Sequence, residues 1–436
     1  MSDMKSIAQH GLESAKKHGA QNASVMLSQR QRMSISCRNG KIEDIDSAGS
    51  SSFTIRLFVD GRYSSFKSSD LRHDKLDEDI HQAIEMTRLL ESDPARTLPD
   101  PSMYENRADL DLELYDSAVA SLTPNDLIEK CKILEAECKK FSDINIFDIG
   151  TTSQSNINNL YMVNTNGFEG SAQTSSCYTG CNVAVKEGEK NITGYHGHMT
   201  RFYSDLHSAE KIAADAVQNC RYRIGSKKIA SGNRTIILDR NVSYFLYYFL
   251  RPLSGYSLVD KESYFMDKLG QQIGSGLLDV HNMPFIKRGL GSQLFDEEGI
   301  SEREAVLFDH GVLAEIPLDT YCANKLNMKS TPDMSNVVLT PGKRSREEMI
   351  ADVQDGIYVI DIMGGNSDRS RGDFSHGICG VAIENGKLTQ NVSEMNITGN
   401  HLELWKNLTE VGNDLCENSN FVMPTLRFDN VSTSGS

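Results

Sequence analysis

The sequence predicts an α+β protein, in which an N-terminal α/β domain with an antiparallel sheet and helices precedes a larger, β-rich C-terminal domain. Alternating runs with hairpin turns recur along the chain, and helical patterns interrupt them mainly in its first half. The length of 436 residues suggests two domains, or one large one, because a single hydrophobic core stops growing beyond about 250 to 300 residues.

The first 90 residues switch between helical and strand patterns. Apolar residues recur at helical spacing over residues 4–18, and near alternation follows. Asn39-Gly40 and Asp60-Gly61 separate the alternating runs, and both pairs tolerate the positive φ of a type I′ turn. A second helical pattern covers residues 76–90. Two hairpins followed by a helix indicate an antiparallel sheet with helices on one face.

Prolines among charged residues mark residues 91–122 as a linker inside the first domain. Pro94, Pro99 and Pro101 lie there, and the restricted backbone around each proline disfavours a helix. The elements predicted after the linker are a helix from Thr123-Pro124 to Cys138, strands over 144–152, 158–164 and 168–185, and a helix over 205–223.

A polar, glycine-bearing stretch at 225–232 follows the last of these helices, and we place the domain boundary within it. The N-terminal domain then covers residues 1–228 and the C-terminal domain residues 229–436. Beyond the boundary we expect mainly strands, with long loops at 327–345 and 363–377. Loops of that length are often functional or mobile.

The densest apolar run of the chain is Tyr244 to Leu250. It is apolar or aromatic all round, which favours a buried helix, although its aromatic content also permits a strand. Pro252 should end or kink that helix. The run is far shorter than the roughly 20 apolar residues of a membrane span.

Composition limits the partners of the chain. Its net charge of −15 repels phosphate backbones and anionic lipid, so neither nucleic acid nor a membrane is an expected partner. Nine cysteines lie without framework spacing, which indicates reduced thiols. The first 20 residues contain no continuous apolar segment, and we therefore expect a cytoplasmic protein.

Histidine and cysteine clusters offer weak candidates for a metal site. His196 and His198 would share one face of a strand, with His207 nearby, and Cys177 and Cys181 have a spacing that zinc sites allow. No HExxH motif occurs, and no third ligand or catalytic carboxylate stands at a motif spacing. A polar strand face and a pair of buried thiols explain these residues better.

Glycine-bearing turns offer candidates for other chemistry. Ser254-Gly255 and Gly291-Ser292 could expose a hydroxyl, but there is no GxSxG and no His or Asp can be assigned to either, so tight turns explain them better. Gly289-Leu290-Gly291 lacks the later glycine of a dinucleotide loop. Asp296-Glu297-Glu298 could gather a cation or position a substrate, although a solvated turn explains them better.

Several glycine-rich runs over residues 252–414 resemble the TldD/PmbA family, and within it the PmbA (TldE) branch, once described as a modulator of DNA gyrase. The runs occur in a fixed order and are PLSGYSLVDKESYFMDKLGQQI, GLGSQLFDEEG, LDTYCANKLNMKST and GGNSDRSRGDFSHGICGVAIENG, followed by ITGN and VGND. The resemblance covers essentially the whole chain.

The resemblance implies a two-domain subunit of a zinc metalloprotease complex. In the family, TldD pairs with TldE as a heterodimer that degrades unfolded peptides or matures peptide antibiotics. The TldD-type subunit carries HExxxH on a helix of its C-terminal domain, and a cysteine near its C-terminus is the third metal ligand.

This chain departs from the family motif at each metal position. Aligning Gly255 and Lys261 with the family residues places Leu246, Tyr247 and Arg251 where His, Glu and His are expected. None of these side chains suits zinc. The resemblance therefore implies no catalytic residue, metal or cofactor in this chain, and zinc in a TldD-type partner.

We expect the chain to position unfolded peptide beside that partner and to complete a closed chamber. The peptide would lie extended along the edge of a sheet. An alternative is a peptide-binding homodimer without protease activity, acting as a regulator or carrier; a weaker third is an autonomous enzyme. The resemblance places the following residues near the substrate groove: Ser254, Gly255, Lys261, Gly289, Gly291, Ser292 and Asp296.

Overall fold

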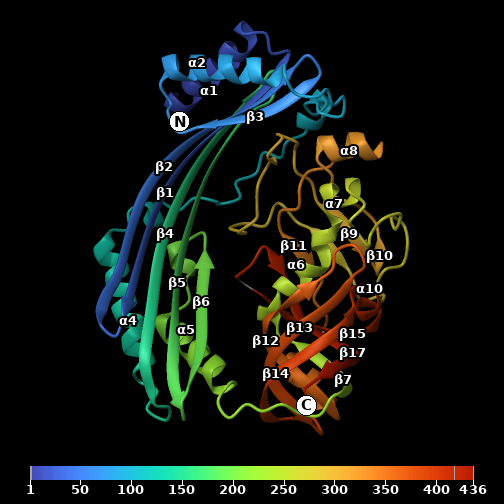
Figure 1. Cartoon of the computed structure of the whole chain (residues 1–436). Helices are drawn as coiled ribbons and strands as arrows, with labels where there is room; N and C mark the ends of the chain where they lie inside the picture. Colours follow the sequence, from blue (N-terminus) through green and yellow to red (C-terminus); the bar gives the residue numbers. More distant parts are fainter. Residues whose placement is uncertain (1, 417, 436) are drawn as a thin grey trace.

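The computed structural model describes residues 2–416 and 418–435 and has an α+β fold, which confirms the predicted fold class (Figure 1). A long antiparallel sheet, sheet A, comes entirely from the first half of the chain. Its strands lie in the order β3-β2-β1-β4-β5-β6. They are β1 (Asn22–Arg38), β2 (Lys41–Val59), β3 (Arg62–Ser68), β4 (Ile146–Asn164), β5 (Glu169–Glu187) and β6 (Lys190–Thr200).

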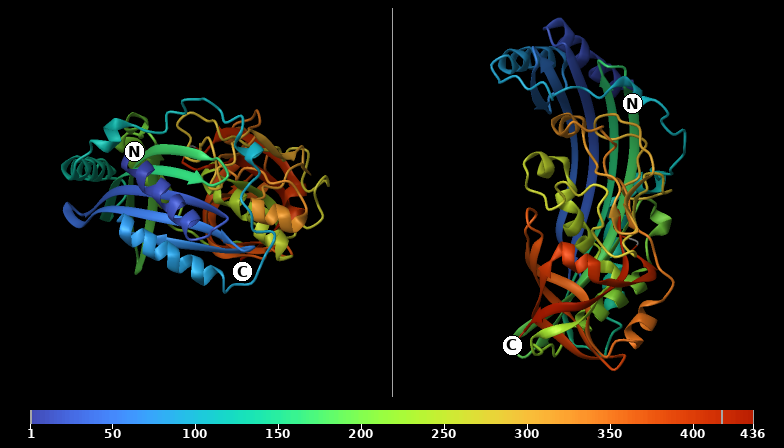
Figure 2. Two further views of the ribbon diagram at one scale, coloured as in Figure 1. Left: turned by 90° about the horizontal axis from the view of Figure 1, so that it is seen from above. Right: turned by 90° about the vertical axis from the view of Figure 1, so that its right-hand side faces the viewer.

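Helices cover one face of sheet A. They are α1 (Ser2–Lys17), α2 (His73–Thr87), α3 (Ser117–Ala120), α4 (Pro124–Cys138) and α5 (Ala209–Arg221), with the 3-10 turn η2 (Tyr203–Asp205). The 3-10 turn η1 (Pro101–Tyr104) lies on the opposite face, where Tyr104 packs against Phe168. Side chains on a strand alternate between faces, and Val25 and Leu27 of β1 are buried in a core with α1 and α2. Figure 2 shows that sheet A extends along the whole molecule.

The other face of sheet A is more polar and lies toward the second half of the chain (Figure 1). Gln154, Asn156 and Asn158 of β4 point to this face and are only half buried, whereas the intervening residues are buried beneath the helices. None of the helices α1 to α5 covers the polar face, and the turn η1 contacts it at one end through Tyr104. A surface able to hydrogen-bond with water or a polar chain therefore lines the space between the two halves.

Two sheets form the second half. Sheet B has the order β14-β13-β12-β7-β17-β15, and sheet C the order β10-β9-β8-β11-β16. The strands are β7 (Gly232–Leu238), β8 (Val280–Asn282), β9 (Ala305–Asp309), β10 (Val312–Leu313), β11 (Val337–Leu339), β12 (Asp355–Ser367), β13 (Asp373–Glu384), β14 (Lys387–Asn400), β15 (Leu408–Leu415), β16 (Phe421–Val422) and β17 (Pro424–Ser434). The helices are η3 (Arg240–Val242), α6 (Tyr244–Leu250), η4 (Arg251–Leu253), α7 (Gly255–Val259), α8 (Thr320–Leu326), α9 (Arg346–Ala351), α10 (His401–Leu404) and η5 (Trp405–Asn407).

The predicted aromatic helix is α6, which lies in the core of the second half. Phe245 and Phe249 are fully buried and pack with Trp405, whose ring centroid is 4.5 Å from that of Phe249. Pro252 lies within η4, just after α6 ends, as its missing N–H requires. The expectation of burial on every side is wrong at Tyr247, which is 40% exposed.

Two predicted loops contain strands. The segment 363–377 is mostly a β-hairpin, because β12 continues to Ser367 and β13 begins at Asp373. The glycines of this segment made it resemble a loop in the sequence. Gly364 and Gly365 have φ of 110° and 136°, and the register between the two strands shifts at this point. The loop 327–345 contains β11. No helix in the described residues is long and apolar enough to cross a membrane.

Candidate functional site

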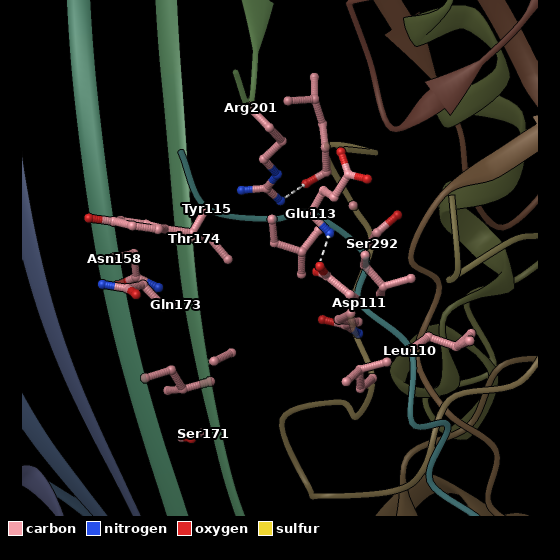
Figure 3. A pocket seen from close by; sticks show the side chains of 18 of the residues that line it. Leu110, Asp111, Glu113, Tyr115, Asn158, Ser171, Gln173, Thr174, Arg201 and Ser292 are labelled. Atoms are coloured by element: carbon pink, nitrogen blue, oxygen red, sulfur yellow. Dashed lines mark hydrogen bonds between the residues drawn. The ribbon is translucent and has the colours of Figure 1, made fainter. Parts of the chain in front are cut away.

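A cavity of about 640 Å³ separates sheet A from the second half of the chain (Figure 3). Three groups of residues line it: Asn158, Leu160 and residues 171–174 of sheet A with Arg201 and Phe202; residues 110–115 of the linker; and residues 290–295 of the second half. A volume of this size is typical of ligand-binding pockets.

One wall of the cavity is an unpaired edge of β5. β6 pairs with β5 only from Cys177 onward, so the edge before that residue has no neighbouring strand. The backbone N–H of Asn164 donates to the backbone carbonyl of Phe168, which fixes the hydrogen-bonding register between β4 and β5. In that register the N–H and C=O groups of Ser171 and Gln173 point away from β4. Two residues of strand edge therefore face the cavity.

The linker forms a strap over this edge, which we define as residues 107–116. At one end the amide of Ser175 donates to the carbonyl of Leu114 over 2.9 Å. At the other end Arg107 Nη1 donates to the carbonyl of Glu169 over 3.1 Å. The strap thus contacts β5 on both sides of Ser171 and Gln173.

Ion pairs hold the middle of the strap to the second half. Glu113 lies 2.8 Å from Lys287 Nζ and 2.8 Å from Arg288 Nη2, and these contacts lower the pKa of its carboxyl. Arg288 also pairs with Asp205 at 3.0 Å. The strap, the loop around residue 288 and η2 are therefore joined by one charge network on the rim of the cavity.

Arg201 lies at the end of the open edge that is nearer to Ser175. Its guanidinium donates to the carbonyls of Ser175, Gly289 and Leu290, which come from both halves of the chain. Burial lowers the pKa of Arg201, and no carboxylate lies within ion-pair distance of it in the described part of the chain.

Family models match most of the chain. The PmbA/TldA metallopeptidase domain 1 matches residues 23–87, the central domain residues 118–221 and the C-terminal domain residues 231–435. The chain belongs to the PmbA/TldD family. This confirms the resemblance seen in its glycine-rich runs.

Relatives match over nearly the full length. The metalloprotease PmbA of Escherichia coli O157:H7 is 28% identical over 94% of this chain and 90% of its own. A crystal structure from Bacteroides thetaiotaomicron, of a protein provisionally named a modulator of DNA gyrase, is 35% identical, covers 99% of both chains and has a TM-score of 0.94. TldE from Thermococcus kodakarensis, 20% identical over 99% of this chain and all of its own, shares the fold with a TM-score of 0.87.

The positions of the family's metal motif do not fit zinc here. Leu246 is a hydrocarbon side chain with no exposed surface. Tyr247 packs its ring against Phe421 at 5.2 Å, and Arg251, at the start of η4, is exposed and cationic. Zinc requires imidazole, thiolate or carboxylate donors, and none of the three motif positions supplies one.

The other metal candidates are dispersed. His198 is buried and its ring stacks on His207 with centroids 3.6 Å apart, while His196 lies 3.5 Å from Asp215. Cys177 and Cys181 are buried, as expected of small apolar thiols. In the described residues, three potential ligands come together only at the surface group Asp279, Asp309 and His310, away from the motif.

Part of the predicted groove borders the cavity. Gly291 and Ser292 line it, and the carbonyl of Gly289 accepts from Arg201 Nε over 3.3 Å. A Cβ on Gly291 would come within 2.3 Å of the carbonyl of Ser335, so the loop requires glycine there. The hydroxyl of Ser292 is buried and donates to Ile286 over 2.6 Å, as expected of a turn.

The remaining predicted groove residues lie outside the cavity. Ser254 accepts from the amide of Ser257 and caps α7, and Gly255 packs against α8. Lys261 is exposed, with a left-handed φ of 58°. The turn at Asp296 is not solvated as expected: this side chain is 6% exposed, accepts from two backbone amides, and burial raises its pKa to about 7.

Sequence reasoning missed the residues that form the open edge. Ser171, Gln173 and Arg201 carry no motif, and their role depends on where β6 ends and on a loop almost 90 positions later. The sequence of the strap does contain a pattern that could have predicted it. Leucines alternate with acids over residues 109–114, as in an extended segment with one apolar side.

Proposed function

We propose that this chain is the TldE-type subunit of a cytoplasmic TldD–TldE-like protease, in which it holds unfolded peptide and completes a chamber with a TldD-like partner. The open edge of β5 in the cavity carries the proposal. The peptide would add a short strand there and bond to the N–H and C=O groups of Ser171 and Gln173. Such bonds select an extended backbone rather than a sequence.

The walls of the cavity suit a peptide. Leu160, Leu294 and Phe295 supply apolar surface beside the edge, and Asn158 and Thr174 supply polar groups. Apolar walls with a few polar groups are typical of ligand pockets. A folded protein would not fit between the strap and β5, whereas an unfolded segment exposes the backbone groups that the edge requires.

We assign the hydrolytic step to the partner. Leu246, Tyr247 and Arg251 give this chain neither zinc ligands nor a carboxylate base. In this proposal the protease activity named for its relatives belongs to the complex of the two subunits and not to this chain alone. The purified chain should contain less than stoichiometric zinc and should not cleave peptide, but a HExxxH-bearing partner should gain activity when mixed with it. One equivalent of zinc together with chelator-sensitive proteolysis by the lone chain would refute this assignment.

The role of the edge is testable in the same protein. Gln173→Pro removes one outward N–H, and Gln173→Ala removes the same side chain but keeps that N–H. We expect the proline variant to lose affinity for a labelled unfolded peptide, and the alanine variant to bind nearly normally, because only the backbone group bonds. Equal affinity for all three proteins would place the peptide elsewhere.

The second candidate is a peptide-binding homodimer that acts as a regulator or carrier. The same open edge supports it, because binding a peptide there requires no catalytic group from a partner subunit. Recovery of a HExxxH-bearing protein with a tagged chain from the source cell favours the protease, and self-association without such a protein favours the homodimer.

A further inference from the structure

Arg201 is a partly buried cation whose hydrogen bonds go only to neutral groups. A guanidinium has five N–H donors, and the carbonyls of Gly289, Ser175 and Leu290 use Nε, one donor of Nη1 and one of Nη2. One N–H remains on each terminal nitrogen. N–H groups on the two terminal nitrogens can bind a carboxylate with two parallel bonds.

The nearby acids do not neutralise Arg201. Glu113 is engaged by Lys287 and Arg288, and Asp205 by Arg288. Asp111 accepts from the amide of Glu113 over 2.9 Å. Because a partly buried charge without a counter-ion is less stable than a paired one, an anion that enters should stabilise the site.

We propose that Arg201 binds a carboxylate of the peptide held on the β5 edge, and that this carboxylate is the peptide's C-terminus. This inference rests on the proposed function. Arg201 lies where the open edge ends: its Nη1 contacts the carbonyl of Ser175, two residues beyond Gln173. The amide of Ser175 already bonds to Leu114 of the strap, so strand pairing stops there and a chain end fits.

The position of Arg201 also sets the direction of the peptide. β5 runs from Glu169 toward Ser175 along the open edge. A C-terminus beside Ser175 and an N-terminal side beside Ser171 place the peptide parallel to β5. The groove then selects free C-termini, as left by an earlier cleavage of a longer chain.

An Asp or Glu side chain offers the same carboxylate chemistry, and the test must separate the two sources. Three labelled forms of one unfolded peptide do so: the free acid, the C-terminal amide, and the amide with one internal Glu. For the wild-type protein we expect the free acid to bind about ten- to a hundredfold more tightly than the amide. The internal Glu should not restore that difference.

The Arg201→Gln variant shows whether Arg201 acts on the carboxylate or only joins the two halves of the chain. It should bind the free acid and the amide with equal affinity. A purely structural role would weaken both peptides alike and keep their ratio. Arg201→Lys keeps the charge, should retain part of the preference for the free acid, and serves as the second variant if Arg201→Gln does not fold.

Three further results would overturn the proposal. The first is equal affinity of the wild-type protein for the free acid and the amide. If Gln173→Pro still weakened the binding of both peptides, the proposed function would stand although this proposal failed. Restoration of affinity by the internal Glu would assign Arg201 to acidic side chains instead. Absence of any peptide binding would refute both proposals.

Discussion

Replacing Glu302 with Gln should stabilise the protein at neutral pH. Glu302 is 4% exposed; its Oε1 accepts from Gln293 Nε2 over 2.6 Å, and its Oε2 has no hydrogen-bond partner. Burial, with Asp296 and Asp333 nearby, raises its pKa from 4.5 to about 8. The folded protein therefore holds a proton that the unfolded chain releases above pH 4.5.

The sign and size of the effect follow from this pKa. Between pH 4.5 and pH 8 the unfolded state binds fewer protons than the folded state, so stability falls as pH rises, by about 1.4 kcal/mol per pH unit. At pH 7 the accumulated loss is about 3 kcal/mol. Gln has nearly the same shape, can still accept from Gln293 and does not titrate, so the variant avoids this loss.

Thermal unfolding of the two proteins at matched pH measures the difference. Near pH 4.5 their melting temperatures should be similar, and by pH 7 the variant should melt about 3–4 °C higher. A constant difference across this range would refute the argument, because it would show that Glu302 does not hold a proton in the folded state. Asp296→Asn, near Glu302 and with a pKa raised to about 7, should show the same sign.

Three other substitutions test separate parts of the structure. Between pH 7 and pH 5 the His401→Gln variant should lose about 2 kcal/mol less stability than the wild type. Burial lowers the pKa of His401 to about 3, so in this range only the unfolded wild-type chain gains a proton there, and thermal melts of both proteins at the two pH values measure the difference. Gly255→Ala should reduce the free energy of unfolding by about 1–3 kcal/mol, because the added Cβ would lie 2.6 Å from the Cβ of Cys322. The control Gly276→Ala should be nearly neutral in the same denaturation assay, because no atom lies within 4 Å of its added Cβ. Tyr358→Phe should cost about 1–3 kcal/mol by removing the hydroxyl that donates to buried Asp239, and a cycle with Asp239→Asn should give less than the sum of the two losses.

Local chemistry made part of the fold predictable. The turns at Asn39-Gly40 and Asp60-Gly61 have positive φ at both residues, as the sequence requires for type I′ hairpins. Period-two burial in the strands and the proline after α6 follow from equally local rules. The segment 363–377 escaped prediction because its glycines serve a bulged hairpin rather than a loop.

The candidate site was less predictable because it depends on distant parts of the chain. The edge of β5 is open only because β6 ends at Thr200, and the strap reaches it from some 60 residues earlier. Arg201 belongs to the site through carbonyls at 289 and 290. The glycine-rich runs identified the family, yet most of the groove residues inferred from them lie outside the cavity.

Amide hydrogen exchange, with and without an unfolded peptide, tests the central claim most directly. The amides of Ser171 and Gln173 point to the cavity and should exchange quickly in the free protein. We predict that bound peptide protects these two amides, while the already bonded amide of Ser175 changes little. Peptide binding with no change at Ser171 and Gln173 would contradict the account.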